Sequence, residues 1–248
     1  LLQIIPYGED QNLLVSRDIS QLERMETMRR DFIANVSHEL KTPLTVVAGF
    51  SEMLADDYAA CSEAEVAHYL KLICEQNARM QRLIEDLLTL SSLETGSSAP
   101  IDERVGIAPM LQSMLADAQA LSAGRHEITL TVDEPSVIRG CANELRSAFG
   151  NLAGNAVRYT PQDGKIDLVW RRREGSAEFV VIDTGIGIAP PHLPRLTERF
   201  YRVDRSRSRE TGGTGLGLAI VKHVLTRHHA TLDIESEPGK GSRFTARF

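Results

Sequence analysis

The sequence predicts an α+β fold of two domains, in which a hairpin of two long helices precedes a domain with mixed strands and helices. Three observations indicate this class. Apolar residues recur at spacings of three and four over two stretches within residues 20–95, the pattern of amphipathic helices. Strand and helix patterns alternate from residue 105 to the end, which is typical of a two-layer α/β domain. A run rich in Gly, Ser and Pro at 96–100 separates the two parts.

Composition and charge limit the class of protein. Of the 248 residues, 42% are hydrophobic and 25% are charged, as in ordinary globular domains. The net charge of -6 argues against a nucleic-acid-binding protein, because such proteins usually carry a basic surplus. The three cysteines lack metal-like spacing, which fits a reducing compartment. The sequence shows no run of 18 apolar residues and begins without Met, so we expect it to be a piece of a longer protein.

Residues 1–19 contain two short strand patterns, Leu1–Ile5 and Leu13–Val15, separated by turn-forming residues. A segment this short cannot bury a core of its own. It fits either the end of an upstream domain or an ordered arm without a function of its own.

The first long helix is expected from about Ile19 to Asp56. Its apolar stripe consists of Phe32, Val36, Leu40, Leu44, Val47, Phe50 and Leu54. His38 lies about 200° around the helix from Val36 and therefore faces water, and Thr42 shares this exposed face. Pro43 inside the helix costs about 3 kcal/mol and predicts a kink beside the histidine.

The exposed His38 allows two interpretations. A lone His on a helix is most often only a solvated side chain. However, an imidazole is mostly uncharged at neutral pH, so an exposed ring nitrogen can act as a nucleophile. Glu39 could take up the proton of the other ring nitrogen, although adjacent residues of a helix do not face each other.

A second helix is expected to follow Ser62 and to end near Glu94, with Ser62 as N-cap and Glu65 as its capping-box partner. Its apolar positions follow a heptad through Val66, Leu70, Ile73, Asn77, Met80, Ile84 and Leu87. Two helices with such stripes expose too much apolar surface as a monomer, so we expect a homodimer with a four-helix bundle. A monomeric hairpin packed on the downstream domain is the alternative.

The remaining elements are expected in the following order. They are a helix at Val105–Ala123, strands at Ile128–Asp133 and Val137–Gly140, a helix at Asn143–Tyr159, strands at Lys165–Arg172 and Phe179–Asp183, a helix at Gly215–His229, and strands at Thr231–Glu235 and Arg243–Phe248.

The helix at 143–159 carries a polar stripe, because Glu144, Asn151, Asn155 and Arg158 fall within about 60° of arc. Amide oxygens suit a hard ion such as Mg²⁺, which prefers few protein ligands together with water and substrate phosphates. An Arg can meet the charge of a phosphate. Taken alone, the stripe is more often a solvated helix face.

Two glycine-rich segments suggest contacts with a nucleotide. Asp183 ends a buried strand and precedes Gly185 and Gly187, so its carboxylate could accept a hydrogen bond from the amine of adenine, although such a pattern usually marks a turn. The segment 212–217 precedes an apolar helix, where free N–H groups and the helix dipole favour phosphate. It lacks the Gly-Lys-Ser/Thr ending of a Walker P-loop.

The segment His38-Glu39-Leu40-Lys41-Thr42-Pro43-Leu44 resembles the H box of sensor histidine kinases, and four later segments agree with that family in order and spacing. Residues 151–159 resemble its N box, 183–187 its G1 box, 199–202 its F box and 212–217 its G2 box. The runs 196–204 and 211–223 are most similar to the phosphate-regulon subgroup. The resemblance covers about residues 20–248.

The resemblance implies a dimerisation and phosphotransfer domain at 20–95, a linker at 96–104 and a GHKL-type α/β sandwich that binds ATP at 105–248. Residues 1–19 look like the tail of a PAS-like sensor domain. Family members of this kind carry membrane spans upstream, so the chain would be the cytoplasmic portion of a bacterial inner-membrane protein.

The resemblance also implies the chemistry. ATP would phosphorylate His38 with Glu39 as the base, and the group would pass to an aspartate of a cognate, PhoB-like response regulator. Thr42 would orient water for phosphatase activity toward that regulator. Asn151 and Asn155 would hold Mg²⁺. The other implied ATP contacts are Arg158, Tyr159, Asp183, Gly185, Gly187, Phe200, Arg202, Gly213, Gly215, Leu216 and Gly217.

Some features depart from the family or leave alternatives open. The family more often has Lys where Arg158 stands and Phe where Thr197 stands. By analogy, the arginine-rich stretch 203–211 is a mobile lid, with Arg202 near the γ-phosphate. A histidine phosphotransfer module would lack the nucleotide motifs. A binding protein with a degenerate ATP pocket stays open from the sequence alone.

Overall fold

The computed structural model describes residues 2–7, 11–16, 18–56, 61–95, 101–133, 136–173, 175–204 and 213–248. Its contacts divide the chain into two compact units, residues 1–77 and residues 78–248, with the division inside the second long helix. Among the described helices, none combines the length and the apolar character that a membrane crossing requires. The predicted linker residues 96–100 and most of the predicted lid lie outside the described residues.

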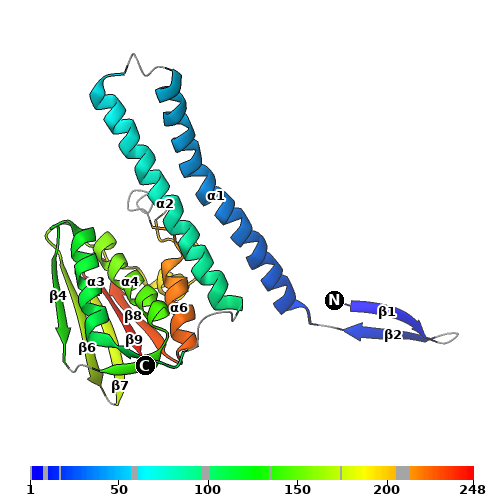
Figure 1. Ribbon diagram of the computed structural model, residues 1–248. Coiled ribbons are helices and arrows are strands. Elements are labelled where there is room, and N and C mark those ends of the chain that lie inside the picture. Colours follow the sequence, from blue (N-terminus) through cyan, green and yellow to red (C-terminus); the bar gives the residue numbers. More distant parts are fainter. Residues whose placement is uncertain are drawn as a thin grey trace. The chain divides into compact units, whose positions relative to one another are not determined.

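The first unit begins with an antiparallel hairpin of β1 (Leu2–Tyr7) and β2 (Gln11–Ser16), in which Ile4 lies opposite Leu14. Both predicted strands are confirmed, and the structure extends each beyond its apolar run. Helix α1 (Ser20–Asp56) follows (Figure 1).

Helices α1 and α2 form as their periodicity predicts. Helix α1 is continuous through Pro43, and the kink expected there stays a prediction. Helix α2 (Glu63–Thr95) begins with the predicted capping box. The backbone N–H of Ser62 donates to Glu65 Oε2 at 2.8 Å, and the N–H of Glu65 donates to Ser62 Oγ at 3.3 Å.

Part of the apolar stripe is exposed in the single chain. The exposed fraction is 59% for Leu44 and 49% for Leu70 in the first unit, and 48% for Ile84 and 66% for Leu88 in the second. Large apolar side chains exposed along a helix face can mark a site of interaction. The single chain therefore leaves exposed Leu44 of the predicted α1 stripe, Leu70 and Ile84 of the predicted α2 heptad, and Leu88, which lies outside that heptad.

The second unit contains a five-stranded sheet of order β4-β6-β7-β9-β8, in which β4 and β6 are parallel and the other neighbours are antiparallel. The strands are β4 (Glu127–Val132), β6 (Lys165–Arg173), β7 (Ser176–Asp183), β8 (Thr231–Glu237) and β9 (Gly241–Arg247). One face is covered by α3 (Ile107–Ser122), α4 (Ala142–Tyr159) and α6 (Gly217–Arg227) (Figure 1). A separate antiparallel pair consists of β3 (Glu103–Gly106) and β5 (Val137–Gly140).

The core of this unit lies between the sheet and the helices. Alternate residues of β6, including Leu168 and Trp170, are completely or almost completely buried. Phe149 of α4 packs against the rings of Phe179 and Trp170, with centroid distances of 4.4 Å and 6.3 Å. Burying a side chain of this size stabilises the fold by about 1.5–3 kcal/mol. The apolar face of α4 is thereby fixed on the sheet, and its opposite face is available for the site.

Several element boundaries differ from the prediction, and one element was not predicted. The helix expected from Val105 begins at Ile107, because residues 103–106 pair with β5 as strand β3, a partner that the local pattern cannot reveal. The helix expected from Gly215 begins at Gly217, because Gly215 has a φ of 75° and cannot continue a right-handed helix. A short 3₁₀ helix, η2 (Pro190–Arg195), was not expected.

Candidate functional site

The carboxylate of Asp183 lies at the end of β7 and is 6% exposed. Its Oδ1 accepts hydrogen bonds from the N–H of Gly185 at 2.8 Å and of Ser242 at 3.2 Å. Because both bonds go to Oδ1, Oδ2 is the oxygen that a ligand can engage. Burial raises the pKa of Asp183 despite these two N–H groups, which lower it.

The turn after Asp183 needs its glycines. A Cβ on Gly185 would lie 2.6 Å from the carbonyl oxygen of Tyr159, and Gly187 has a φ of 65° with its Cβ position 2.0 Å from the carbonyl oxygen of Glu237. Neither position can accept a side chain without backbone movement. The turn is therefore packed tightly between the end of α4 and the turn before β9, which holds the carboxylate in place.

Helix α4 carries both predicted amide ligands. The Asn151 Nδ2 group donates to the Ser147 carbonyl at 2.9 Å, so its amide is oriented with Oδ1 toward α6. A Cβ on Gly217 would lie 2.4 Å from that Oδ1, which shows how closely α6 approaches. Asn155, one turn later, is half-buried. Burial lowers the pKa of the Arg158 guanidinium, which still stays charged at neutral pH.

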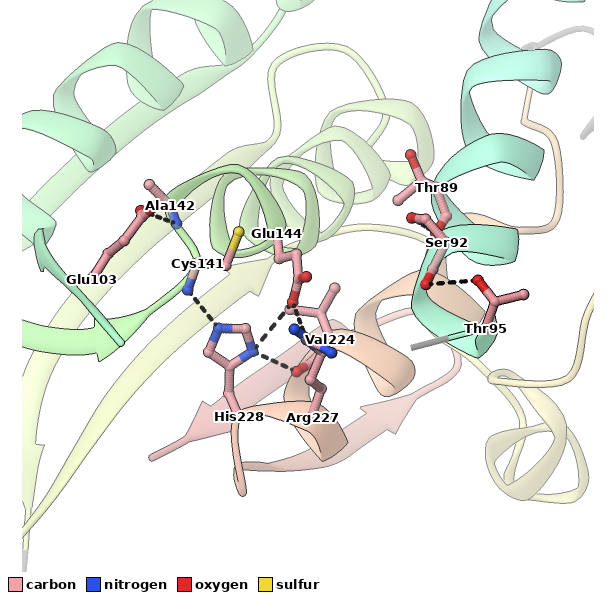
Figure 2. A network of polar contacts seen from close by, with 10 residues as sticks. All are labelled: Thr89, Ser92, Thr95, Glu103, Cys141, Ala142, Glu144, Val224, Arg227 and His228. Carbon is pink, nitrogen blue, oxygen red and sulfur yellow. Dashed lines mark hydrogen bonds and ion pairs between the residues drawn. The ribbon is translucent and has the colours of Figure 1, made fainter. Parts of the chain in front are cut away.

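The start of α4 is capped by residues from other elements (Figure 2). The backbone N–H of Cys141 donates to His228 Nε2 at 3.0 Å, and His228 Nδ1 donates to the Val224 carbonyl at 2.8 Å. The N–H of Ala142 donates to Glu103 Oε2 at 3.3 Å. His228 thus joins the end of α6 to the start of α4 through its two ring nitrogens. The sequence gives no signal of this contact.

Glu144 does not join the nucleotide contacts, although it belongs to the predicted polar stripe. Its carboxylate is buried, and its Oε2 lies 3.1 Å from Arg227 Nε (Figure 2). The stripe on α4 is thus divided, with one end used in an ion pair with α6 and the other end at the candidate site.

The predicted F and G2 segments are bonded to each other. The N–H of Phe200 donates to the Gly215 carbonyl at 2.8 Å, and the Arg202 guanidinium donates to the Gly213 carbonyl at 2.5 Å. Phe200 has a φ of 60°, and a Cβ on Gly215 would lie 2.9 Å from the Phe200 Cα. The N–H of Leu216 donates to Thr214 Oγ1 at 3.2 Å, and the Leu216 side chain is fully buried. Any contact of Leu216 with a ligand would therefore involve its backbone.

These segments enclose a cavity of about 380 Å³ in the second unit. The predicted residues that line it are Asn151, Asn155, Arg158, Tyr159, Asp183, Gly187, Arg202, Gly213, Gly215 and Gly217. Three predicted residues, Gly185, Phe200 and Leu216, do not line it and instead shape the backbone around it. Lining residues that the sequence did not single out are Arg82, Glu85, Asp86, Ile186, Ile188, Leu196, Tyr201, Val203, Asp204, Thr214, Leu218, Ser242 and Phe244.

The second half of α2 belongs to this unit and contributes Asp86 to the cavity. The Thr214 hydroxyl donates to Asp86 Oδ2 at 2.7 Å. Burial raises the pKa of Asp86, while the Thr214 hydrogen bond and the charge of Arg158 lower it. A local sequence pattern cannot show this contact between α2 and the glycine-rich loop.

The predicted phospho-acceptor belongs to the first unit. His38 and Thr42 are exposed on α1, as the helical pattern predicts, and Glu39 is half-buried. The Thr42 hydroxyl donates to the His38 carbonyl at 3.2 Å. The roles of these three residues stay predictions.

The donor set suits Mg²⁺ better than a transition metal. Within the described ranges, no group of three His, Cys, Asp or Glu side chains could hold a metal ion. The cavity instead offers amide oxygens from α4 beside a glycine-rich helix start. Mg²⁺ binds such oxygens together with phosphates and water, so these residues fit an ion that arrives with a nucleotide.

Two families match separate parts of the chain. Residues 28–96 match the His Kinase A (phospho-acceptor) domain. Residues 140–248 match the family described as histidine kinase-, DNA gyrase B- and HSP90-like ATPase.

The chain is also similar to curated proteins. It is 51% identical to the phosphate regulon sensor protein PhoR of Pseudomonas aeruginosa over 98% of the chain and 55% of that protein. It is 39% identical to PhoR of Haemophilus influenzae over 96% of the chain and 56% of that protein. The chain thus spans about half the length of these relatives.

Solved structures agree. The histidine kinase AdeS of Acinetobacter baumannii matches with a TM-score of 0.68 at 22% identity, over 85% of this chain and 96% of that one, which shows a likeness of fold. ShkA in complex with AMPPNP matches with a TM-score of 0.63 at 27% identity, over 88% of this chain and 45% of that one. The predicted fold class, a helical phospho-acceptor region followed by an α/β ATPase domain, is confirmed.

Proposed function

The chain belongs to the sensor histidine kinases, with a core like that of the phosphate-regulon sensors, and on this premise we propose that it phosphorylates itself on His38 with ATP. One observation carries the proposal. A single chain contains an exposed His38 in its phospho-acceptor segment and, in its ATPase segment, a cavity with a buried carboxylate and a glycine-rich helix start. A phosphotransfer module alone would need no such cavity.

Asp183 would select adenine. Its Oδ2 can accept a hydrogen bond from the exocyclic amine of adenine, while guanine presents a carbonyl oxygen at the corresponding position. Ile186, Ile188 and Phe244 also line the cavity and can cover the faces of a base. The complex of the related ShkA with AMPPNP, an ATP analogue, supports this choice.

The triphosphate would extend toward the start of α6. Gly215 and Gly217 line the cavity at the start of α6, and the N-terminus of the helix favours negative charge. Arg158 and Arg202 line the same cavity and can meet phosphate oxygens. Asn151 and Asn155 would hold Mg²⁺, which neutralises phosphate charge when it is bound. The roles of Tyr159, Gly185, Gly187, Phe200, Gly213 and Leu216 are to shape this pocket.

At His38, a ring nitrogen would attack the γ-phosphorus as the bond from that phosphorus to the bridging oxygen breaks and ADP leaves. Glu39 would accept the proton from the imidazole. Transfer of this kind depends mainly on positioning and charge neutralisation. The phosphoryl group would then pass to an aspartate of a PhoB-like response regulator, and Thr42 would orient water for the reverse, phosphatase task.

We propose further that two chains form a homodimer through α1 and α2. The exposed Leu44, Leu70, Ile84 and Leu88 support this, because a four-helix bundle would bury them. The division into a tail at 1–19, a phosphotransfer domain at 20–95, a linker at 96–104 and an ATP-binding domain at 105–248 belongs to the same proposal. We also propose that this chain is the cytoplasmic portion of a bacterial inner-membrane protein, attached to the membrane through an upstream part.

The test is incubation of the purified chain with γ-labelled ATP and Mg²⁺. We expect acid-labile, alkali-stable phosphate that mass spectrometry assigns to His38, and none in a His38→Gln variant that still binds ATP. ATP binding without phosphate on the wild-type chain would support a regulatory binding protein instead. Labelling that persists in His38→Gln would overturn the choice of acceptor.

A further inference from the structure

A cluster of three side chains lies beside the candidate nucleotide cavity. His192 and Arg195 belong to the 3₁₀ helix η2, and Tyr201 follows six residues after its end. His192 Nδ1 lies 2.7 Å from the Tyr201 hydroxyl. The Arg195 guanidinium carbon lies 4.3 Å from the centroid of the Tyr201 ring, a cation–π contact. The Tyr201 ring is thus held at its hydroxyl and on one face.

Both holding groups are themselves fixed. Arg195 makes three hydrogen bonds to the Glu198 carboxylate, from Nε to Oε1 at 3.2 Å and to Oε2 at 3.3 Å, and from Nη2 to Oε2 at 3.1 Å. This bidentate geometry restricts the guanidinium. Pro190 and Pro194 restrict the backbone of η2. The N–H of Tyr201 donates to the Glu198 carbonyl at 3.3 Å. The cluster is therefore anchored through both backbone and side chains.

The ring held in this way forms part of the cavity wall. Tyr201 lines the cavity together with its neighbour Arg202, whose guanidinium donates to the Gly213 carbonyl of the glycine-rich loop. The residue before it, Phe200, has a φ of 60°, so the chain turns sharply at this point. Because the hydroxyl is bonded to His192, Tyr201 offers the cavity its ring and not its hydroxyl.

We propose that His192 and Arg195 are positioning residues that hold the Tyr201 ring against the bound nucleotide. This inference rests on the proposed function and adds to it two residues that bind no substrate themselves. It predicts that loosening the ring weakens nucleotide binding and leaves the rate of phosphoryl transfer from bound nucleotide unchanged.

The experiment uses three single variants of the full chain, the double variant that combines His192→Ala with Tyr201→Phe, and one control. His192→Ala removes the partner of the hydroxyl, Tyr201→Phe removes only the hydroxyl, and His192→Asn keeps a hydrogen-bonding atom near the position of Nδ1. His229→Asn is the matched control, because His229 is exposed with a φ of 53°, which Asn tolerates. For each variant, ATP affinity is measured by calorimetry, and KM and kcat are measured for autophosphorylation.

We expect His192→Ala and Tyr201→Phe each to raise the Kd and KM for ATP by about three- to tenfold, the equivalent of one net hydrogen bond, with kcat unchanged. The double variant should be no worse than either single variant, because both remove the same contact. His192→Asn should return to within about twofold of wild type, and His229→Asn should match it.

Other outcomes contradict the proposal in distinguishable ways. An unchanged KM in both single variants, additive losses in the double variant, or a fall in kcat alone would overturn the positioning role. Should His192→Ala fail to fold, as judged by circular dichroism, Tyr201→Phe and His192→Asn decide between the same outcomes. A wild-type chain that does not bind ATP would overturn the proposed function and this inference with it, whereas normal binding in every variant would overturn the inference alone.

Discussion

Replacing Asp183 by Asn separates ATP recognition from folding. The buried carboxylate uses Oδ1 to accept two backbone N–H groups, and an Asn can keep those bonds through its own Oδ1. The change replaces only Oδ2, by an amide that donates where adenine also donates. We therefore expect Asp183→Asn to lose nucleotide affinity while it keeps the turn that follows β7.

The magnitude follows from the lost hydrogen bond. A hydrogen bond to a charged group contributes about 1.5–3 kcal/mol, which corresponds to roughly a 10- to 150-fold weaker Kd for ATP. The new amide can donate to the carbonyl oxygen of guanine, so the preference for ATP over GTP should narrow in the variant. Both affinities can be measured by calorimetry on wild type and variant at the same salt concentration.

The thermal stability of unliganded Asp183→Asn should stay the same or increase, although its affinity for ATP falls. Burial raises the pKa of Asp183, so the fold favours the protonated acid over the carboxylate. The stability that the acid contributes is fully present below the ordinary pKa of Asp and is lost as the pH rises through the raised value. At a pH above the raised value the wild type has lost it, and the neutral Asn variant should there unfold at the same or a higher temperature than the wild type.

Two results would refute this reasoning. One is an Asp183→Asn variant that binds ATP within twofold of wild type, which would show that Oδ2 does not face adenine. The other is a marked fall in the unfolding temperature of the unliganded variant, which would show that the carboxylate charge stabilises the turn.

Three further predictions follow from other parts of the chain. Burial by itself raises the pKa of Glu178, but hydrogen bonds from Arg171 and Arg247 outweigh it and lower the pKa. The stability that this ion network contributes is fully present above the ordinary pKa of Glu. It is lost as the pH falls through the lowered value. Glu178→Gln should therefore cost about 2 kcal/mol at pH 7 in chemical denaturation, with the difference from wild type shrinking in acid, and an equal loss at every pH would contradict it. His228→Ala removes the acceptor for the first amide before α4, so the free energy of unfolding should fall by about 1–3 kcal/mol in the same assay. ATP binding should weaken as a consequence. Unchanged stability would show that the cap is dispensable. Thr42→Ala should spare autophosphorylation and prolong the life of the phosphorylated response regulator, measured with a labelled regulator, and an equal loss of both activities would refute that division of roles.

Much of the fold could be predicted because local rules dominate it. The heptad of α2 and the capping box of Ser62 and Glu65 act over a few residues, and the structure contains both. Strand β3 could not be predicted, because it forms only by pairing with β5, and its residues were predicted as the end of the linker and the start of a helix.

The candidate site likewise contains residues that sequence motifs predict and residues whose contacts only the structure reveals. Asp183 and Gly217 could be predicted because the segments 183–187 and 212–217 resemble family motifs in order and spacing, whereas such a glycine pattern alone usually marks a turn. The contact between His192 and Tyr201 was missed, because it depends on a 3₁₀ helix and on the left-handed backbone of Phe200. The partnership of His228 with the start of α4 was missed because it joins positions far apart in the chain.

The groups that cap the start of α4 come from other elements, and this limits which fragments of the protein can be expected to fold alone. Family similarity in the ATPase part begins at residue 140, at the last residue of β5. A fragment cut there would lose Glu103, which accepts the Ala142 amide, and most of the two-stranded sheet. It would also lose α3 and uncover the apolar side chains that α3 packs against, which invites aggregation. The smallest piece that can be expected to fold alone therefore starts some forty residues earlier, before β3.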